Sequence, residues 1–202
     1  MVKVAVLFSG GKDSAMALWW AQQNHKAACI ITMDSENKES YMFHTDKISE
    51  IPKLAKKLKI PLIFKKTKGV KEEELKDLKL AIQEAKKKYG IKAVVSGALA
   101  SNYQRTRVDN ICKEIDLESF SPFWHIDPQE YWNQILKLGF KIQIVKVASD
   151  GLTDKWVGKI VTKKDVAELK KLGERYGFHL AFEGGEAETL VVDGPIFNNT
   201  NN

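Results

Sequence analysis

A short polar stretch near the N-terminus contains the residue types that can bind phosphate. The chain reads Ser-Gly-Gly-Lys-Asp-Ser over 9–14, directly after an apolar run at 2–8 and before a helix-like segment. Glycines let backbone N–H groups approach anionic oxygens, and the first turn of the following helix adds its positive dipole end. The expected phosphate-binding residues are Ser9, Gly10, Gly11, Lys12, Asp13 and Ser14.

The aspartate in this stretch separates it from other phosphate loops. A Walker A loop needs four residues between its first glycine and Gly-Lys, followed by Ser or Thr, whereas here Asp13 follows Lys12. The stretch does not read G-x-G-x-x-G either. Asp13 could hold Mg²⁺ directly or through water, or it could cap the helix. A second interpretation is a strand-to-helix turn whose glycines only permit tight packing.

Alternating strand-like and helix-like segments predict the frame that positions this turn. The expected strands lie at 2–8, 27–33, 60–64 and 91–96. The expected helices lie at 14–24, 46–59, 72–89 and 103–115. This order favours an α/β fold, with an open parallel sheet and helices on both faces. In such a sheet, ligands bind at the carboxyl ends of the strands.

The alternation changes after about residue 120. A helix is expected from Asp127-Pro128 to Leu138, a strand at 140–147, a lysine-rich helix at 163–176, and a short strand near the end. We therefore predict two lobes with a boundary near residue 125. Residues 1–125 would form the ATP-binding domain, and residues 126–202 a smaller α+β substrate-binding lobe with a disordered, asparagine-rich tail after Phe197.

Composition excludes some classes of function. The 202 residues carry a net charge of +6, and the positive charge is almost entirely lysine. No apolar stretch approaches the roughly 20 residues of a membrane span, so we expect a cytoplasmic protein with no membrane association. A nucleic-acid reader more often clusters arginine with exposed aromatic residues, so no nucleic-acid partner is expected. The lysines indicate a charged surface or a basic face for an acidic partner; an oligomer remains open.

The two cysteines do not form a reactive pair. Cys29 and Cys112 lie far apart in the sequence, each among apolar neighbours. This spacing contains no C-x-x-C motif of a redox or metal site. We expect both thiols to be buried in the core.

Residues 9–14 match in full the pattern S-G-G-x-D-S/T and resemble the PP-loop of the ATP pyrophosphatases, which cleave ATP to AMP and pyrophosphate. The resemblance implies a nucleotide-alpha-hydrolase-like, Rossmann-like fold. It also implies that the protein uses ATP with Mg²⁺. The loop would hold the pyrophosphate group while the α-phosphorus of ATP is attacked. The lack of a cysteine pair argues against the sulfur-transferring members, and the length leaves no room for a glutaminase domain.

Three further stretches narrow the resemblance. They read ESYMFHT at 39–45, GALASNYQRTRVDNIC at 97–112 and EGGEAETLVVDGP at 183–195. Together with residues 9–14, and in this order, they resemble the diphthine–ammonia ligases over nearly the whole chain. The resemblance implies amidation by ammonium of diphthine on translation elongation factor 2. The reaction would pass through an acyl-adenylate and give diphthamide, AMP and pyrophosphate.

The third stretch concentrates acids around two glycines. Closely spaced carboxylates repel one another unless a cation is present, and both ammonium and the trimethylammonium group of diphthine are cations. A carboxylate could also deprotonate ammonium to the nucleophile ammonia. The alternative is a solvated acidic turn. The expected substrate-binding residues of this stretch are Glu183, Gly184, Gly185, Glu186 and Glu188. The catalytic candidates are its three glutamates together with Lys12 and Asp13.

Other candidates lie near the predicted strand ends. Arginine suits bidentate contacts to phosphate or carboxylate, so at least one of Arg105 and Arg107 is expected at the site, with structural salt bridges as the alternative. Tyr103 and Gln104 begin the same element and are further substrate-binding candidates. The remaining nucleotide-side candidates are Met33, His44 and Gly97. A partly buried histidine without a role at the site is the alternative for His44.

Two other functions stay open from the residues alone. A PP-loop enzyme could adenylate a different small metabolite or an RNA base, and an RNA substrate would bind with a steep salt dependence. A non-catalytic ATP sensor would bind ATP without producing AMP.

Overall fold

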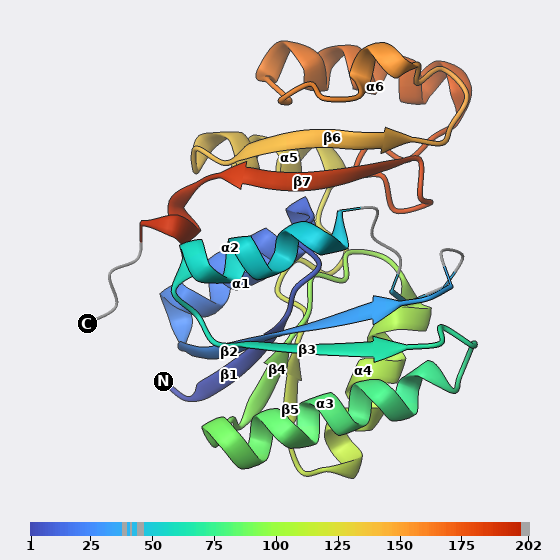
Figure 1. The fold of residues 1–202 in the computed structure, drawn as a ribbon. Coiled ribbons are helices and arrows are strands. Elements are labelled where there is room, and N and C mark those ends of the chain that lie inside the picture. The colour runs from blue at the N-terminus through green and yellow to red at the C-terminus, as the bar shows by residue number, and fades with distance from the viewer. Residues whose placement is uncertain (38–39, 41, 44–46, 199–202) are drawn as a thin grey trace.

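The computed structural model describes residues 1–37, 40, 42–43 and 47–198. Predictions for His44 and for the tail at 199–202 therefore fall outside the described residues. The described part contains a five-stranded parallel sheet in the order β3-β2-β1-β4-β5 (Figure 1). The strands are β1 Lys3–Leu7, β2 Lys26–Ser35, β3 Leu62–Thr67, β4 Ala93–Val95 and β5 Glu118–Phe120.

Helices cover both faces of this sheet, as the alternating pattern predicted (Figure 1). One face carries α1, and α2 lies beside it after the short 3-10 turn η1; the other face carries α3 and α4. The helices are α1 Lys12–Asn24, η1 Ile48–Glu50, α2 Ile51–Leu58, α3 Glu74–Tyr89 and α4 Asn102–Glu114. The α/β class and the parallel sheet are confirmed.

Two local features differ from the sequence-based expectation. Strand β5 was not predicted, because Glu118, Ser119 and Phe120 form a short edge strand that is never fully buried and so has no apolar signal. Helix α3 begins at Glu74 rather than at Glu72, since Glu72 adopts a left-handed backbone conformation with φ of 67°. A residue in that conformation cannot continue a right-handed helix.

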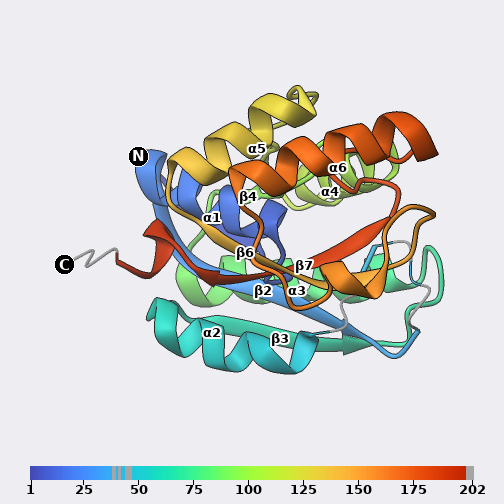
Figure 2. The same ribbon diagram turned by 90° about the horizontal axis from the view of Figure 1, so that it is seen from above.

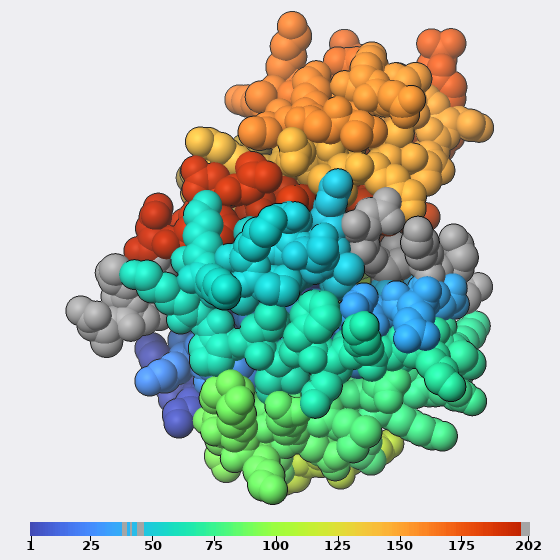
Figure 3. All heavy atoms as spheres, viewed as in Figure 1, coloured from blue at the N-terminus to red at the C-terminus, as the bar shows by residue number. Residues whose placement is uncertain are grey.

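The C-terminal residues form a second layer over α1. Strands β6 and β7 pair antiparallel, and α6 lies above this two-stranded ribbon and packs against α5 (Figures 1 and 2). The elements are α5 Pro128–Lys137, β6 Lys141–Val147, η2 Asp154–Trp156, α6 Lys163–Tyr176, β7 Ala187–Asp193 and η3 Pro195–Phe197. In the space-filling view, the red C-terminal segment lies directly against the cyan surface of α2 (Figure 3).

Local signals explain where the C-terminal helices begin. Asp127 caps α5 by accepting a hydrogen bond from the backbone N–H of Glu130, with Pro128 in the first turn. Thr162 and Asp165 form a reciprocal capping box at the start of α6. These caps satisfy the free N–H groups at each helix start, and they are visible in the sequence.

The core has two parts, one on each side of the parallel sheet. The first continues from β1 and β4 through α1 into the C-terminal layer, and it includes Trp132 and Trp156, both fully buried. The second lies under α3 and α4 and contains Cys29 and Cys112. Burial raises the pKa of both thiols to about 12. The expectation of inert core cysteines is confirmed.

Among the described residues, no helix is both long and apolar enough to cross a membrane.

Candidate functional site

The Ser-Gly-Gly-Lys-Asp-Ser turn lies at the reversal point of the strand order. β1 lies between β2 and β4, and the chain leaves β1 toward α1 on one face and leaves β4 toward α4 on the other. The loops after β1 and β4 therefore meet at the carboxyl edge of the sheet, the position where open α/β sheets bind ligands. Residues 9–14 follow β1, and Gly97 follows β4.

The turn is ordered by its own hydroxyl groups and by β7. The Ser14 hydroxyl donates to the carbonyl oxygen of Gly11 at 3.0 Å, and the N–H of Gly11 donates to Ser9 Oγ at 3.4 Å. Gly10 has a φ of 80°, which only glycine adopts readily. The N–H of Lys12 donates to Thr189 Oγ1 of β7 at 3.1 Å. The Ser-Gly-Gly-Lys-Asp-Ser turn thus depends on a strand about 180 residues away along the chain.

Lys12 and Asp13 form a partly buried ion pair. Lys12 Nζ lies 2.9 Å from Asp13 Oδ2, and the lysine residue is only 2% exposed. The ammonium group also lies 5.7 Å from the centre of the Phe182 ring, within range of a cation–π interaction. Asp13 Oδ1 is buried and has no hydrogen-bond partner among the described residues. One oxygen of this carboxylate is therefore left for a further ligand.

Gly97 sits against the backbone of the turn. A Cβ atom at this position would lie 2.6 Å from the carbonyl carbon of Asp13 and 2.9 Å from the backbone nitrogen of Ser14. Real Cβ atoms do not approach backbone this closely, so only glycine fits. Gly97 was predicted to be a nucleotide-binding residue. In the structure it packs against the backbone of Asp13 and Ser14 in the turn.

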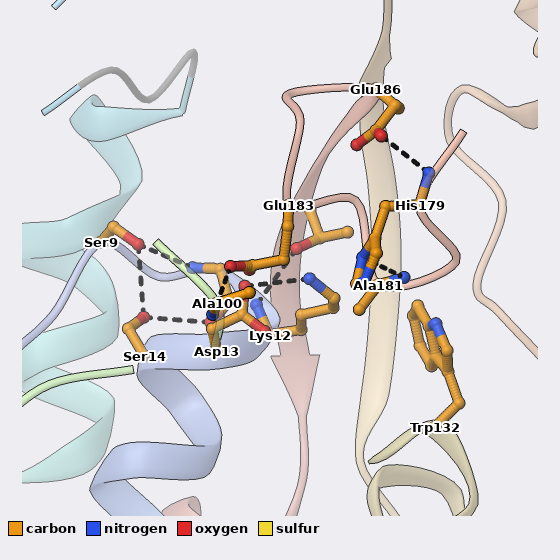
Figure 4. A network of polar contacts seen from close by, with 12 residues as sticks. Ser9, Lys12, Asp13, Ser14, Ala100, Trp132, His179, Ala181, Glu183 and Glu186 are labelled. Carbon is orange, nitrogen blue, oxygen red and sulfur yellow. Dashed lines mark hydrogen bonds and ion pairs between the residues drawn. The ribbon is translucent and has the colours of Figure 1, made fainter. Parts of the chain in front are cut away.

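Glu183 completes a compact group of charges with the ion pair (Figure 4). Its Oε2 atom accepts a hydrogen bond from the N–H of Ala100 at 3.0 Å, which ties the loop before β7 to the loop after β4. Burial, followed by the negative charge of Asp13, raises the pKa of Glu183 to about 6. A carboxyl group with such a pKa gains and loses a proton near neutral pH.

The other two predicted glutamates have different surroundings. Glu186 accepts hydrogen bonds at 2.8 Å from the N–H groups of His179 and Gly184, so both of its oxygens hold the loop that carries Glu183 (Figure 4). Glu188 lies on β7 with Lys146 Nζ at 3.5 Å. Gly185, with a φ of 80°, allows the chain to turn between the glutamates.

The predicted arginines each contact an acid and an aromatic ring. Arg107 pairs with Glu72 and lies over the Tyr103 ring at 3.4 Å, while Tyr103 Oη donates to the same carboxylate at 3.1 Å. This pairing lowers the pKa of Glu72. Arg105 lies 3.6 Å from Asp109 and stacks over Trp124 at 4.6 Å. Both arginines therefore form the salt bridges that were the alternative to a role at the site.

Two other predicted residues have simple places in the fold. The N–H of Gln104 donates to Ser101 Oγ, the N-cap of α4. Met33, near the end of β2, is 7% exposed and belongs to the core under α3. Neither observation assigns a ligand contact.

A pocket of about 290 Å³ includes Ala100, the residue whose N–H donates to Glu183, in its lining. It lies where three loops meet, those before α5, after β4 and before Phe182. Its lining residues are Leu99, Ala100, His125, Ile126, Pro128, His179 and Ala181. The sequence analysis missed both histidines. His125 has no neighbouring motif, and His179 lies four residues before the acidic stretch at 183–195; only the fold brings the two residues together.

Phe182 is a second residue that the sequence did not single out. It has a φ of 61°, an unusual conformation for a bulky side chain, and its ring packs edge-on against Trp132 at 6.1 Å. Strained residues of this kind persist where the surroundings hold them, often at functional sites. The one signal for Phe182 in the sequence is that it directly precedes the acidic stretch at 183–195.

The parallel sheet with the S-G-G-x-D-S turn after β1 defines an α/β protein of the PP-loop class. Sequence models of the diphthamide synthase N-terminal domain and C-terminal domain match residues 2–119 and 127–200. The chain belongs to the diphthamide synthase family.

Individual relatives agree with this assignment. The diphthine–ammonia ligase of Mus musculus is 30% identical over 97% of this chain and 80% of its own length. That of Schizosaccharomyces pombe is 32% identical over 97% of this chain, which spans 35% of that longer protein. A solved structure titled as a predicted subunit of tRNA methyltransferase, from Methanocaldococcus jannaschii, has a TM-score of 0.50 at 18% identity, covering 96% of this chain and 98% of its own. That likeness shows a shared fold alone.

Proposed function

We propose that this protein is an ATP-dependent ligase that forms a C–N bond, converting the carboxylate of diphthine into the amide of diphthamide with ammonium as the nitrogen source. The observation that carries the proposal is the placement of Glu183 beside the Lys12–Asp13 pair at the PP-loop. A phosphate-binding turn and an acid–base group are thereby joined in one site. Family membership supports the choice of substrate.

The loop residues would bind the triphosphate of ATP. The N–H groups at the start of α1, the hydroxyl groups of Ser9 and Ser14, and the ammonium group of Lys12 can neutralise the departing pyrophosphate. Asp13 Oδ1, buried and without a partner among the described residues, fits a role as the carboxylate ligand of Mg²⁺. Mg²⁺ usually takes one or two carboxylates and completes its shell with phosphates and water. Bound there, it would neutralise phosphate charge.

Within the described residues, no group of three or more His, Cys, Asp or Glu side chains could hold a metal by itself.

The chemistry requires two displacements. The diphthine carboxylate attacks the α-phosphorus, pyrophosphate leaves, and an acyl-adenylate forms. Glu183 then takes a proton from ammonium, and ammonia attacks the acyl carbon. AMP leaves with the bonding electron pair, and the nitrogen releases one further proton to solvent to give the amide. With a pKa of about 6, Glu183 is mostly ionised at neutral pH and can accept that proton. The protein supplies orientation and charge neutralisation.

The pocket that includes Ala100 in its lining is the proposed place of the diphthine side chain. Leu99, Ile126 and Pro128 provide apolar walls for its methylene and methyl groups. Glu183, which accepts from the N–H of Ala100, offers negative charge to a cation, either the trimethylammonium group or ammonium. The N–H of Ala181 donates to His179 Nδ1 at 3.3 Å, which leaves Nε2 of that ring for a contact with the substrate.

The protein partner in this proposal is translation elongation factor 2, and the reaction takes place in the cytoplasm. The test incubates the full chain with ATP, Mg²⁺, ammonium and elongation factor 2 that bears diphthine, and follows AMP and the mass of the factor. We expect AMP in step with conversion of carboxylate to amide. ATP binding without AMP would indicate a sensor, and AMP without a mass change would indicate another acceptor; either result would overturn the proposal.

A further inference from the structure

Tyr131 in α5 is a fully buried tyrosine whose hydroxyl group lacks a partner. The residue is 0% exposed, and among the described residues no hydrogen-bond partner reaches its Oη atom. Buried hydroxyl groups are nearly always hydrogen-bonded, because leaving one unpaired costs free energy. A phenylalanine would fill the same space without that cost. The hydroxyl group therefore calls for an explanation other than packing.

The position of Tyr131 is firmly set by its neighbours. Its ring lies 5.5 Å from that of Phe123, and the next residue, Trp132, donates its indole N–H to the carbonyl oxygen of Leu180 at 2.9 Å. Leu180 precedes Phe182, the aromatic neighbour of Lys12. Helix α5 is thus fixed to the loop that leads into the PP-loop site.

Asp13 and Glu183 are the carboxyl groups whose charges act on the phenol. Asp13 Oδ1 and Tyr131 Oη are both buried atoms without a hydrogen-bond partner among the described residues. The pKa of Tyr131 is raised well above its usual range. The causes, largest first, are burial, the charge of Asp13, the contact of Asp13 with the phenol, and the charge of Glu183. The phenol accordingly keeps its proton and can donate a hydrogen bond.

We propose that Tyr131 is a positioning residue for Asp13. When nucleotide and Mg²⁺ bind, its hydroxyl group donates to Oδ1 while Lys12 holds Oδ2, so the carboxylate is fixed at both oxygens. The second lone pair of Oδ1 is then directed at the cation. This inference rests on the proposed function only in requiring a magnesium–nucleotide complex at the PP-loop, whatever the acyl substrate.

The test uses the full chain with Tyr131→Phe, and Tyr176→Phe as a control, because Tyr176 is 44% exposed and belongs to no part of the site. The thermal midpoint of unfolding is measured without ligand. The affinity for ATP is measured by calorimetry over a series of Mg²⁺ concentrations. For Tyr131→Phe we expect an unchanged or higher midpoint, because an unpaired buried hydroxyl is removed. We expect the Mg²⁺ concentration for half-maximal ATP binding to rise about tenfold.

If Tyr131→Phe also lowers the thermal midpoint, a double-variant cycle with Asp13→Asn separates an effect through Asp13 from a general loss of stability. If Tyr131 acts through Asp13, Tyr131→Phe has no further effect on ATP affinity in the Asp13→Asn background. Equal effects in both backgrounds, or an unchanged Mg²⁺ requirement in the single variant, would overturn the inference. These readouts need no diphthine, so a wild-type protein inactive on diphthine would contradict the proposed function without affecting this test.

Discussion

The backbone of Gly97 packs directly on that of Asp13, so that a Cβ atom on Gly97 would lie 2.6 Å from the carbonyl carbon of Asp13. The loop after β4, through Gly97, therefore fixes the position of the turn at residues 9–14. We predict that Gly97→Ala displaces the turn and lowers ATP affinity at least tenfold, as titration calorimetry would measure.

Gly90→Ala is the matched control for this substitution. Gly90 ends α3 with a φ of 67°, and nothing lies within 4 Å of a Cβ atom there. The added methyl group should cost about 1 kcal/mol of stability through backbone strain and leave ATP affinity unchanged. Equal losses of affinity in the two variants would contradict the role given to Gly97.

Asp13→Asn should abolish turnover while the fold survives. The amide keeps the shape of the side chain but removes the charge that pairs with Lys12 and the proposed ligand of Mg²⁺. We expect AMP production to fall by at least a hundredfold, with a circular dichroism spectrum like that of the wild type. Asp150→Asn, in the loop after β6, serves as the control and should retain full activity. A fully active Asp13→Asn protein would show that the PP-loop has another role.

The raised pKa of Glu183 predicts opposite pH trends for activity and stability. As a base, Glu183 must be ionised, so kcat/KM should rise with pH and level off above about 6. The folded state binds this proton more tightly than the unfolded state does. The stabilising contribution is therefore complete below about 4.5 and is lost as the pH rises through about 6.

Glu183→Gln tests both trends in one protein. The variant should be nearly inactive, with no rise of residual activity around pH 6, and its unfolding free energy should lack the decrease between about pH 4.5 and 6. If the rise in activity persists in the variant, the titrating group is elsewhere.

Glu186→Ala should separate loop order from nucleotide binding. The substitution removes the acceptors of the His179 and Gly184 N–H groups, so the loop that carries Glu183 loses its internal support. We expect kcat to fall about tenfold, ATP affinity to stay near the wild-type value, and stability to drop by about 1–3 kcal/mol. Glu174→Ala, on the exposed side of α6, is the control. A loss of ATP affinity equal to the loss in kcat would contradict this separation.

Much of the fold was predictable because its signals are local. Helix α6 has the predicted bounds, Lys163–Tyr176, since a capping threonine begins it and Gly177 ends it. The phosphate-binding turn is likewise a contiguous stretch with its chemistry in six residues. Strand β5 was missed because an edge strand of three residues has no hydrophobic pattern.

The rest of the site arises from contacts between distant segments. Nothing near Tyr131 in the sequence indicates a phosphate loop, yet the fold places it by Asp13. The pairing of Lys12 with Thr189 is equally invisible to any local pattern. The close spacing of Glu183 and Glu186 suggested one shared role, but hydrogen bonding gives one to Ala100 and the other to its own loop.

The contact of β7 with the PP-loop has a consequence for how the protein is made. The N–H of Val191 donates to the carbonyl oxygen of Gly10 at 2.8 Å, and that of Lys12 to Thr189. The ribosome synthesises the loop first and these partners nearly last, and contacts so distant in the chain also form slowly. The proposed ATP site is therefore completed only when translation is almost finished, and a nascent or truncated chain without β7 carries the loop without its support.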